Sequence, residues 1–135
     1  MSTLGVGVDV VDVETFALQL ADTASGFVAA TFTAGERRDA QGEPRRLGAR
    51  FAAKEALVKA WSGARLGSPP AASTVDLREI EVASDAYDRP LLRLHGAVAA
   101  GVAALAEGRD VRAHVSLSHD GPTAVAMVVL EAGSG

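Results

Sequence analysis

The stretch RFAAKEALVKAW, residues 50–61, carries the clearest helical pattern in the chain. Strong helix formers fill it, and the pattern extends back to about Arg45, which predicts a long helix ending near Trp61. At roughly 100° per residue, one side of this helix carries bulky side chains: Leu47, Phe51, Leu57, Val58 and Trp61. Most of the opposite side is small: Ala49, Ala52, Ala53, Ala56 and Ala60. The alanine side therefore predicts close packing against another backbone or another subunit.

Four charged residues interrupt this mostly apolar helix. Glu55 and Lys59 are four residues apart and project together between the two sides, whereas Arg50 and Lys54 lie among the bulky side chains. One interpretation is an ordinary Glu–Lys pair, with Arg50 and Lys54 reaching solvent along their aliphatic stems. The other is a cleft for a metal and an anion, in which Glu55 supplies one of the few protein oxygens that Mg²⁺ needs. Spacing alone favours the first.

Length and composition predict one folded domain over residues 1–135. The chain has 48% hydrophobic and 22% charged residues and a net charge of -4, which is typical of a globular protein. Mild acidity argues against a general nucleic-acid binder, which needs a basic surface. The chain has no cysteine, which excludes disulfides, thiolate metal sites and cysteine nucleophiles.

Its N-terminal residues do not resemble a secretory signal. Asp9 and Asp12 interrupt the apolar run early, no cationic segment precedes it, and no apolar run of 18 residues occurs anywhere. We therefore expect a cytoplasmic protein without a membrane partner.

Elements flanking the long helix predict an α+β domain. The pattern indicates a buried strand at 4–11, a helix at 13–21 capped by Asp12, and a short helix from about Ala34, where Thr33 and Glu36 have capping-box spacing. Strands follow at 78–84 and 89–96, then an alanine-rich helix at 96–108 and a hairpin of strands 111–119 and 123–131. We expect one antiparallel sheet packed with a long central helix and shorter helices.

Residues 62–76 read SGARLGSPPAASTVD, the most loop-like part of the sequence. Adjacent prolines and small polar residues predict a mobile loop that acts as a flap.

A second carboxylate for a metal site is available near the first strand. Asp9 ends that strand, and Gly5 and Gly7 before it let other groups come near. The alternative is a turn or helix-capping aspartate.

The stretch HVSLSHD, residues 114–120, predicts a polar stripe on one strand. Alternation places His114, Ser116 and Ser118 on one face, with His119 on the other side at the turn. Such a stripe is either a solvated sheet face or a set of phosphate and nucleotide contacts.

Other site chemistries have little support. His114 and His119 fall on different faces and lack a third strong ligand, which argues against zinc. A Ser-His-Asp hydrolase lacks its G-x-S-x-G turn. His95 has no partner nearby in the sequence, and we expect it to be structural.

Four motifs in order resemble the holo-acyl-carrier-protein synthases, which are small 4'-phosphopantetheinyl transferases. They are GVGVDVVDVE near the start, FTAGER at 32–37, RFAAKEALVKAW at 50–61 and HVSLSHDG at 114–121. The resemblance spans nearly the whole chain, and GERRDA and KAWSG look most like actinobacterial, in particular mycobacterial, members. It implies transfer of the phosphopantetheine arm of coenzyme A to a serine of an apo acyl carrier protein, with Mg²⁺, in support of fatty acid biosynthesis. It also implies a homotrimer with each active site between neighbouring subunits.

The resemblance also implies roles for residues that match its motifs. Asp9 and Glu55 match the metal-binding carboxylates, and Lys59 matches the lysine beside the transferred phosphate. Positions near coenzyme A and its 3'-phosphate are matched by Arg50, Ser118 and His119, and less firmly by Ser116, His114 and Asp120. The carrier serine loses its proton to Glu55 or to a metal-bound water, and the sequence does not choose between them.

Two departures from the family pattern concern the partners. Thr15 stands where many relatives carry a carrier-docking arginine, so docking is expected to use other cations: Arg37, Arg38, Arg45 or Arg46. The usual glycine-rich turn after the long helix is replaced by WSGARLGSPPAAS, residues 61–73. Two other functions stay open: a non-catalytic module that binds coenzyme A or a nucleotide, and a structural oligomer in which the charged strip is a buried salt bridge.

Overall fold

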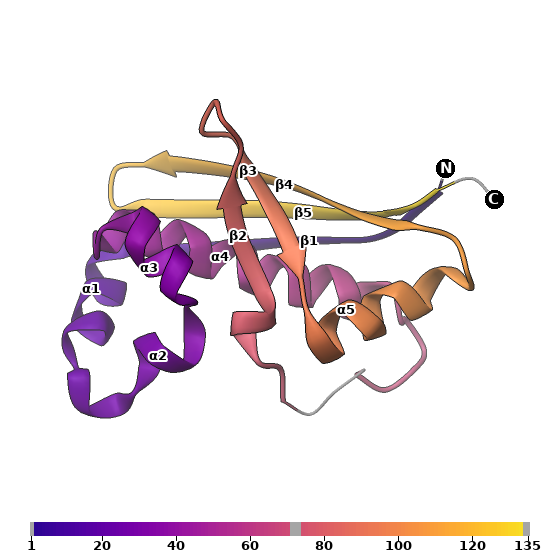
Figure 1. The fold of residues 1–135 in the computed structure, drawn as a ribbon, viewed down its shortest axis with the longest axis horizontal. Coiled ribbons are helices and arrows are strands. Elements are labelled where there is room, and N and C mark those ends of the chain that lie inside the picture. The colour runs from indigo at the N-terminus through magenta and orange to yellow at the C-terminus, as the bar shows by residue number, and fades with distance from the viewer. Residues whose placement is uncertain (1, 71–73, 134–135) are drawn as a thin grey trace.

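The computed structural model describes residues 2–70 and 74–133, and it confirms the α+β class. Figure 1 shows a long helix beneath strands that run the length of the molecule, with short helices at one end. The α-helices are α1 Val13–Ala21, α2 Phe27–Thr31, α3 Ala34–Ala40, α4 Pro44–Gly63 and α5 Gly96–Ala103, with 3₁₀ turns Thr23–Ser25, Leu77–Glu79 and Ala104–Ala106. The strands are β1 Ser2–Asp12, β2 Ile80–Ser84, β3 Pro90–Leu94, β4 Val111–Asp120 and β5 Thr123–Ala132.

Two antiparallel sheets form, where the sequence predicted one. The larger has the order β1-β5-β4, and β2 pairs with β3 in a separate hairpin. In Figure 1 this hairpin crosses the long strands instead of lying beside them. Side chains from α3 and α4 occupy the edge of β2 opposite β3, as described below, so no strand of the larger sheet pairs there.

Helix α4 packs on the larger sheet with its alanine side. Ala52, Ala56 and Ala60 are 0% exposed, and β1 lies directly on them. A Cβ at Gly7 would clash with the backbone of Ala56 and Ala60, and Gly5 is equally close to Ala60. The close-packed partner of the alanine side is therefore this chain's own β1.

Several helix ends follow the predicted caps. The Asp12 side chain accepts a bond from the Thr15 amide at the start of α1. Thr33 and Glu36 form a complete capping box at the start of α3. These local signals fix where the chain turns, because a cap satisfies amides that the helix leaves unpaired.

Some boundaries differ from the prediction. Helix α2 was missed because it has five residues and no side-chain cap, and it starts after Gly26 in the left-handed region at φ 71°. Residues 78 and 79, predicted to begin a strand, belong to the 3₁₀ turn Leu77–Glu79, since the Asp76 side chain caps the Arg78 amide. The regular part of α5 ends at Ala103, before the predicted 108. Of the predicted flap at 62–76, residues 71–73 lie outside the described residues.

Phenylalanines hold the short helices against α4. Phe16, Phe27 and Phe51 lie within 5.4–5.9 Å of one another by ring centroids. Phe32 joins them edge-on and is 1% exposed. This cluster fixes α1 and α2 beside the helix that carries the charged strip.

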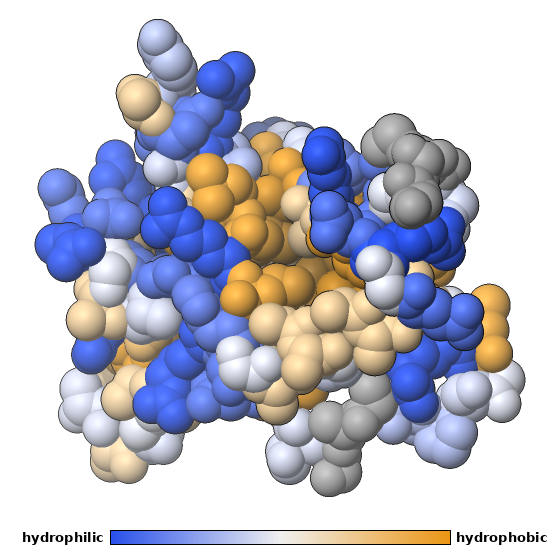
Figure 2. All heavy atoms as spheres, turned by 45° about the vertical axis from the view of Figure 1, so that its right-hand side comes forward, coloured by the Kyte–Doolittle hydropathy of each residue, from blue (hydrophilic) through white to orange (hydrophobic). Residues whose placement is uncertain are grey.

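Part of the core stays open between the two sheets. A pocket of about 370 Å³ lies there, and its apolar lining includes Leu92, Leu94, Val102 and Val111. Figure 2 shows hydrophobic atoms at the centre of this side of the molecule, framed by hydrophilic ones. In the described parts of the chain no helix is long and apolar enough to cross a membrane.

Candidate functional site

Asp9 and Lys59 join β1 to α4 at a solvent-accessible edge. Asp9 follows Gly5 and Gly7 on the side of β1 that faces the helix, as strand alternation requires. The Lys59 Nζ lies 2.9 Å from the Asp9 Oδ1 and donates a bond of 3.1 Å to the Val8 carbonyl. The Asp9 side chain is 17% exposed and that of Lys59 is 55% exposed. The pair is therefore ordered and still open to a ligand.

Glu55 lies one turn before Lys59 and is half-buried. Burial raises the pKa of the Glu55 carboxyl, the negative charge of Asp9 raises it further, and Lys59 lowers it. Glu55 and Asp9 thus repel each other, which a divalent cation between them would relieve. The two carboxylates fit Mg²⁺, because this ion takes one or two protein carboxylates and completes its shell with water and phosphate oxygens. No group of three or more such ligands occurs within residues 2–70 and 74–133.

The structure corrects the simpler interpretation of the charged strip. Lys59 turns to Asp9 instead of pairing with Glu55. Lys54 does not reach solvent along its stem: its ammonium is fully buried and pairs with Glu36 at 2.7 Å. The lysines of one helix therefore belong to different environments.

Arg50 and His119 both line a pocket of about 380 Å³, which is separate from the cluster of Asp9, Glu55 and Lys59. The Arg50 Nη1 donates a bond of 3.3 Å to the Arg46 carbonyl, and its Nε is buried with no acceptor in the described structure. The His119 Nε2 lies 3.4 Å from the Arg45 carbonyl, where only a protonated nitrogen can donate. An unsatisfied guanidinium nitrogen and an imidazole in one pocket suit a phosphate group.

Most of this pocket was not predicted. Its other lining residues come from α3, the start of α4, the β2–β3 hairpin and β4: Asp39, Arg46, Ala49, Val82, Ser84, Asp88, Pro90 and Leu117. Asp88 has φ 64°, in the left-handed region that few residues other than glycine adopt. The pocket has no local sequence signal, since it depends on how four segments come together.

The polar stripe of β4 lies elsewhere. His114, Ser116 and Ser118 are exposed on one sheet face, as predicted, and none of them lines the pocket of Arg50 and His119. His114 lies 3.3 Å from a carboxylate oxygen of Glu131 on the neighbouring strand. Asp120 is also exposed. Within one chain the stripe is a solvated sheet face.

The two clusters point in different directions from α4. At about 100° per residue, Arg50 lies roughly 140° from Glu55 and roughly 180° from Lys59 around the helix axis. The pocket of Arg50 and His119 has neither Glu55 nor Lys59 in its lining. Within one chain the two clusters therefore lie on different sides of the helix.

The cations expected to dock a partner lie on α3 and α4. Arg37, Arg38, Arg45 and Arg46 are all exposed. Arg38 lies 3.7 Å from Asp39, and Arg46 lies 3.2 Å from Glu43. Thr15, in contrast, donates its hydroxyl to Asp12 at 2.6 Å.

Comparison with known proteins shows which family has this fold and these motifs. The model of the 4'-phosphopantetheinyl transferase superfamily matches residues 5–125, which include most of β1 and all of α4 and β4. The chain belongs to this family. A holo-[acyl-carrier-protein] synthase of Mycobacterium ulcerans is 46% identical over 135 residues, covering 97% of this chain and 98% of the relative.

Solved structures of the family share the whole fold. The acyl carrier protein synthase of Mycobacterium tuberculosis is 45% identical with a TM-score of 0.78, covering 98% of this chain and 100% of that chain. An acyl carrier protein synthase from Chronobacterium ammoniagenes, in complex with coenzyme A, is 41% identical with a TM-score of 0.86, covering 99% of this chain and 100% of that chain.

Proposed function

We propose that this chain is a holo-[acyl-carrier-protein] synthase that serves fatty acid biosynthesis in the cytoplasm. It transfers the 4'-phosphopantetheine group of coenzyme A to a serine hydroxyl of an apo acyl carrier protein and releases adenosine 3',5'-bisphosphate. The observation that carries this function is the ordered set of Asp9, Glu55 and Lys59 on β1 and α4. These positions carry the carboxylates and the cation that phosphoryl-type transfer needs.

Asp9 and Glu55 are proposed to hold Mg²⁺. When bound, Mg²⁺ supplies charge neutralisation for the pyrophosphate of coenzyme A. Lys59 already lies against Asp9 at 2.9 Å and is more than half exposed, so its ammonium can also contact the phosphate that is transferred. The protein's part is to hold these charges in place before the substrate arrives.

The nucleotide end of coenzyme A is proposed to lie in the pocket of Arg50 and His119. The buried, unpaired Nε of Arg50 and the imidazole of His119 suit its 3'-phosphate. Ser116 and Ser118 are exposed on the adjoining sheet face and can donate hydroxyls to a ligand that crosses it.

We further propose that the complete site forms between subunits of a homotrimer. Arg50 and Lys59 point to opposite sides of one helix, so one coenzyme A cannot contact both within a chain. The sheet face of β1 also exposes Val6, Val8 and Val10 at 50–62%. Such an apolar stripe on a sheet is unusual for a monomer, and burial between subunits would remove it from water.

Mass spectrometry of an apo acyl carrier protein tests the function. The carrier should gain one phosphopantetheine mass when incubated with the protein, coenzyme A and Mg²⁺, and should gain none when Mg²⁺ is chelated. No gain with any carrier offered would overturn the proposal and would leave a non-catalytic coenzyme A-binding module. Against that module stands the assembled trio of Asp9, Glu55 and Lys59, which binding of a nucleotide alone does not require.

Mixing two inactive variants tests the shared site. Arg50→Ala and Lys59→Met damage different half-sites, so a mixed trimer contains some sites that are intact on both sides. Unfolding and refolding the two together should restore part of the transfer activity, whereas either alone stays inactive. No recovery in the mixture would contradict a site between subunits.

A further inference from the structure

Lys54 is a buried cation with all of its hydrogen-bonding capacity used. Its side chain is 0% exposed, and the ammonium donates to Glu36 Oε1 at 2.7 Å, the Ile80 carbonyl at 2.6 Å and the Leu77 carbonyl at 2.8 Å. An ammonium has three donors, so none is left over. Burial lowers the pKa of Lys54, and the charge of Glu36 opposes this.

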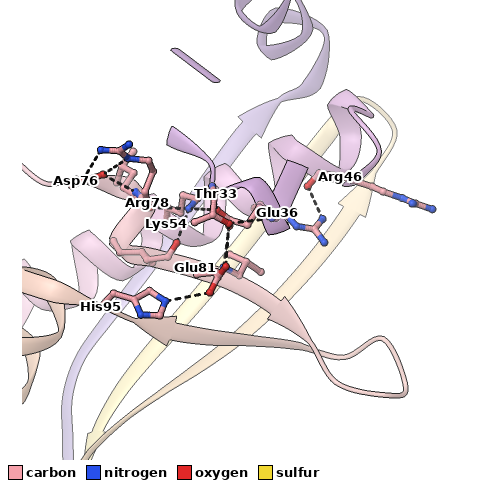
Figure 3. Close-up of polar contacts among 12 residues, drawn as sticks. Thr33, Glu36, Arg46, Lys54, Asp76, Arg78, Glu81 and His95 are labelled. Carbon is pink, nitrogen blue, oxygen red and sulfur yellow. Dashed lines mark hydrogen bonds and ion pairs between the residues drawn. The ribbon is translucent and has the colours of Figure 1, made fainter. Parts of the chain in front are cut away.

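Glu36 is the matching buried anion. Its side chain is 1% exposed, and Oε1 accepts the Thr33 amide at 3.0 Å as well as Lys54. The other oxygen, Oε2, accepts the Val82 amide at 3.0 Å. Figure 3 shows Thr33 and Glu36 at the start of α3 beside Lys54 of α4, with the Thr33 hydroxyl donating to Glu81 of β2 at 3.0 Å.

Together these two side chains replace a neighbouring strand. In the described part of the sheet β2 pairs with β3, and the opposite edge of β2 carries the Ile80 carbonyl and the Val82 amide. Lys54 of α4 takes the first and Glu36 of α3 takes the second. On this edge the β2–β3 hairpin is therefore held by side chains of the helices, in the place where a strand would otherwise pair.

This hairpin is also one wall of the pocket of Arg50 and His119. Val82, Ser84, Asp88 and Pro90 line the pocket from the hairpin, and Arg50 faces them from α4, one turn before Lys54. Val82 is both anchored by Glu36 and part of the lining. A shift of the hairpin thus changes the pocket directly.

We propose that the Lys54–Glu36 pair is a positioning device that sets the width of the nucleotide pocket. The inference rests on the proposed function, because it assigns the pocket to coenzyme A. A buried ion pair is a weak source of stability, and apolar residues of similar volume often stabilise a core as well or better. Apolar side chains cannot bind the Ile80 carbonyl and the Val82 amide, so the polar pair serves the hairpin's position. Lys54 and Glu36 then act on substrate affinity and not on the chemical step.

Glu36→Gln is the sharpest test. The side-chain oxygen of the new glutamine can still accept hydrogen bonds from Lys54 and Thr33. Its NH₂ group then faces the Val82 amide, and because both groups are donors they cannot form a hydrogen bond. We expect the Kd for adenosine 3',5'-bisphosphate and the KM for coenzyme A to rise by about tenfold or more, with kcat changed by less than about threefold. Calorimetry of the purified protein and steady-state kinetics measure these values.

Val102→Ala is the matched control. Val102 is 3% exposed and packs in the core, and it does not line the pocket of Arg50 and His119. We expect this variant to lower the Tm while the Kd and KM stay unchanged. If Glu36→Gln also lowers only the Tm, the pair is structural and the proposal is wrong. Failure of the wild-type protein to bind adenosine 3',5'-bisphosphate would instead overturn the proposed function.

A double variant, Lys54→Met with Glu36→Met, covers the case in which Glu36→Gln does not fold. It leaves no unpaired buried charge, yet the Ile80 carbonyl and the Val82 amide lose their partners. A folded protein with a raised Kd supports the proposal, and a folded protein with an unchanged Kd contradicts it. If neither variant folds, the pair is required for folding as such, and the proposal fails.

Discussion

Lys54 and Lys59 lie five residues apart on α4, but their ammonium groups lie in opposite environments: one is buried and the other is accessible to solvent. Lys54 is fully buried and gives all three donors to Glu36 and two carbonyls, whereas the side chain of Lys59 is 55% exposed and binds Asp9 and one carbonyl. Both are ion pairs of similar length, 2.7 and 2.9 Å. The difference lies in what remains available: Lys54 is committed to the protein, and Lys59 can still meet a substrate.

The comparison separates a charge that is fully used inside the protein from a charge that remains accessible to a ligand. Removing one partner of a buried pair leaves the other charge without water or counter-ion, which is costly. Removing one partner of an exposed pair costs little, because solvent takes its place. Loss of Lys54 should therefore be seen first in folding, and loss of Lys59 first in catalysis.

The largest effect is expected for Lys54→Met. It strands Glu36 as a buried carboxylate without its cation, so the free energy of unfolding should fall by about 3–5 kcal/mol. Urea denaturation measures this against the wild-type protein. If the free energy of unfolding fell by less than about 1 kcal/mol, the size typical of an exposed pair, Lys54 would not differ from Lys59 in its effect on stability.

Lys59→Met should reverse that pattern. The transfer rate is expected to fall by about 10²-fold, since one preorganised charge at the phosphate is lost. The free energy of unfolding should fall by less than for Lys54→Met, because the side chain of Lys59 is 55% exposed and water can replace much of its charge. Kinetics and urea denaturation on the same preparation provide both values, and an unstable but fully active protein would contradict the assignment.

Glu55 gives a pH-dependent test of the open site. Burial and the charge of Asp9 raise its pKa in the folded state, so the folded protein holds this proton more tightly than the unfolded chain. Its contribution to stability is then present at acidic pH and is lost as pH rises through the raised pKa. Above the raised pKa the ionised Glu55 is unfavourable for folding, so Glu55→Gln should raise the free energy of unfolding there and have no such effect in acid.

The same shift predicts how Mg²⁺ binding depends on pH. A metal-binding carboxylate must be deprotonated, so the Mg²⁺ requirement should increase as pH falls towards the raised pKa of Glu55. Titration of the transfer rate with Mg²⁺ at several pH values measures this. A Mg²⁺ requirement that is the same at every pH where the protein folds would argue against Glu55 as a ligand.

The smallest effect is expected at Thr15. Thr15→Arg adds a cation on α1 at the cost of the 2.6 Å hydrogen bond to Asp12. Carrier proteins are acidic, so the KM for the carrier should fall a few-fold while the KM for coenzyme A stays the same. The gain should disappear at high salt. An unchanged carrier KM would mean that carrier docking does not reach α1.

Local patterns of the sequence predicted much of the fold. The caps at Asp12 and Thr33, the long helix and the final hairpin depend on neighbouring residues, and all four are confirmed. The two strands of the β2–β3 hairpin were predicted, but their separation from the larger sheet was not. The outer edge of β2 is filled by side chains from segments that lie 26 and 46 residues away along the chain. Helix periodicity placed Lys54 among bulky residues and could not show that Glu36 reaches it there.

The candidate site was predicted in part for the same reason. Strand alternation and helix spacing bring Asp9, Glu55 and Lys59 to facing positions on β1 and α4, and the structure places them together. Arg50 and His119 share a pocket that needs four segments to close, so only these two of its residues were named in advance as ligand contacts. The exposed stripe of Ser116 and Ser118 stays a prediction as a coenzyme A contact.

One paired measurement on Glu55→Gln tests the central claim, that Glu55 and Lys59 of α4 form the transfer site together with Asp9 of β1. The variant protein is mixed with coenzyme A, Mg²⁺ and apo carrier protein, and the carrier is weighed over time while urea denaturation reports stability. The account predicts almost no phosphopantetheine transfer from a protein at least as stable as the wild type near neutral pH. Transfer at the wild-type rate, or inactivity that merely follows a loss of stability, would contradict it.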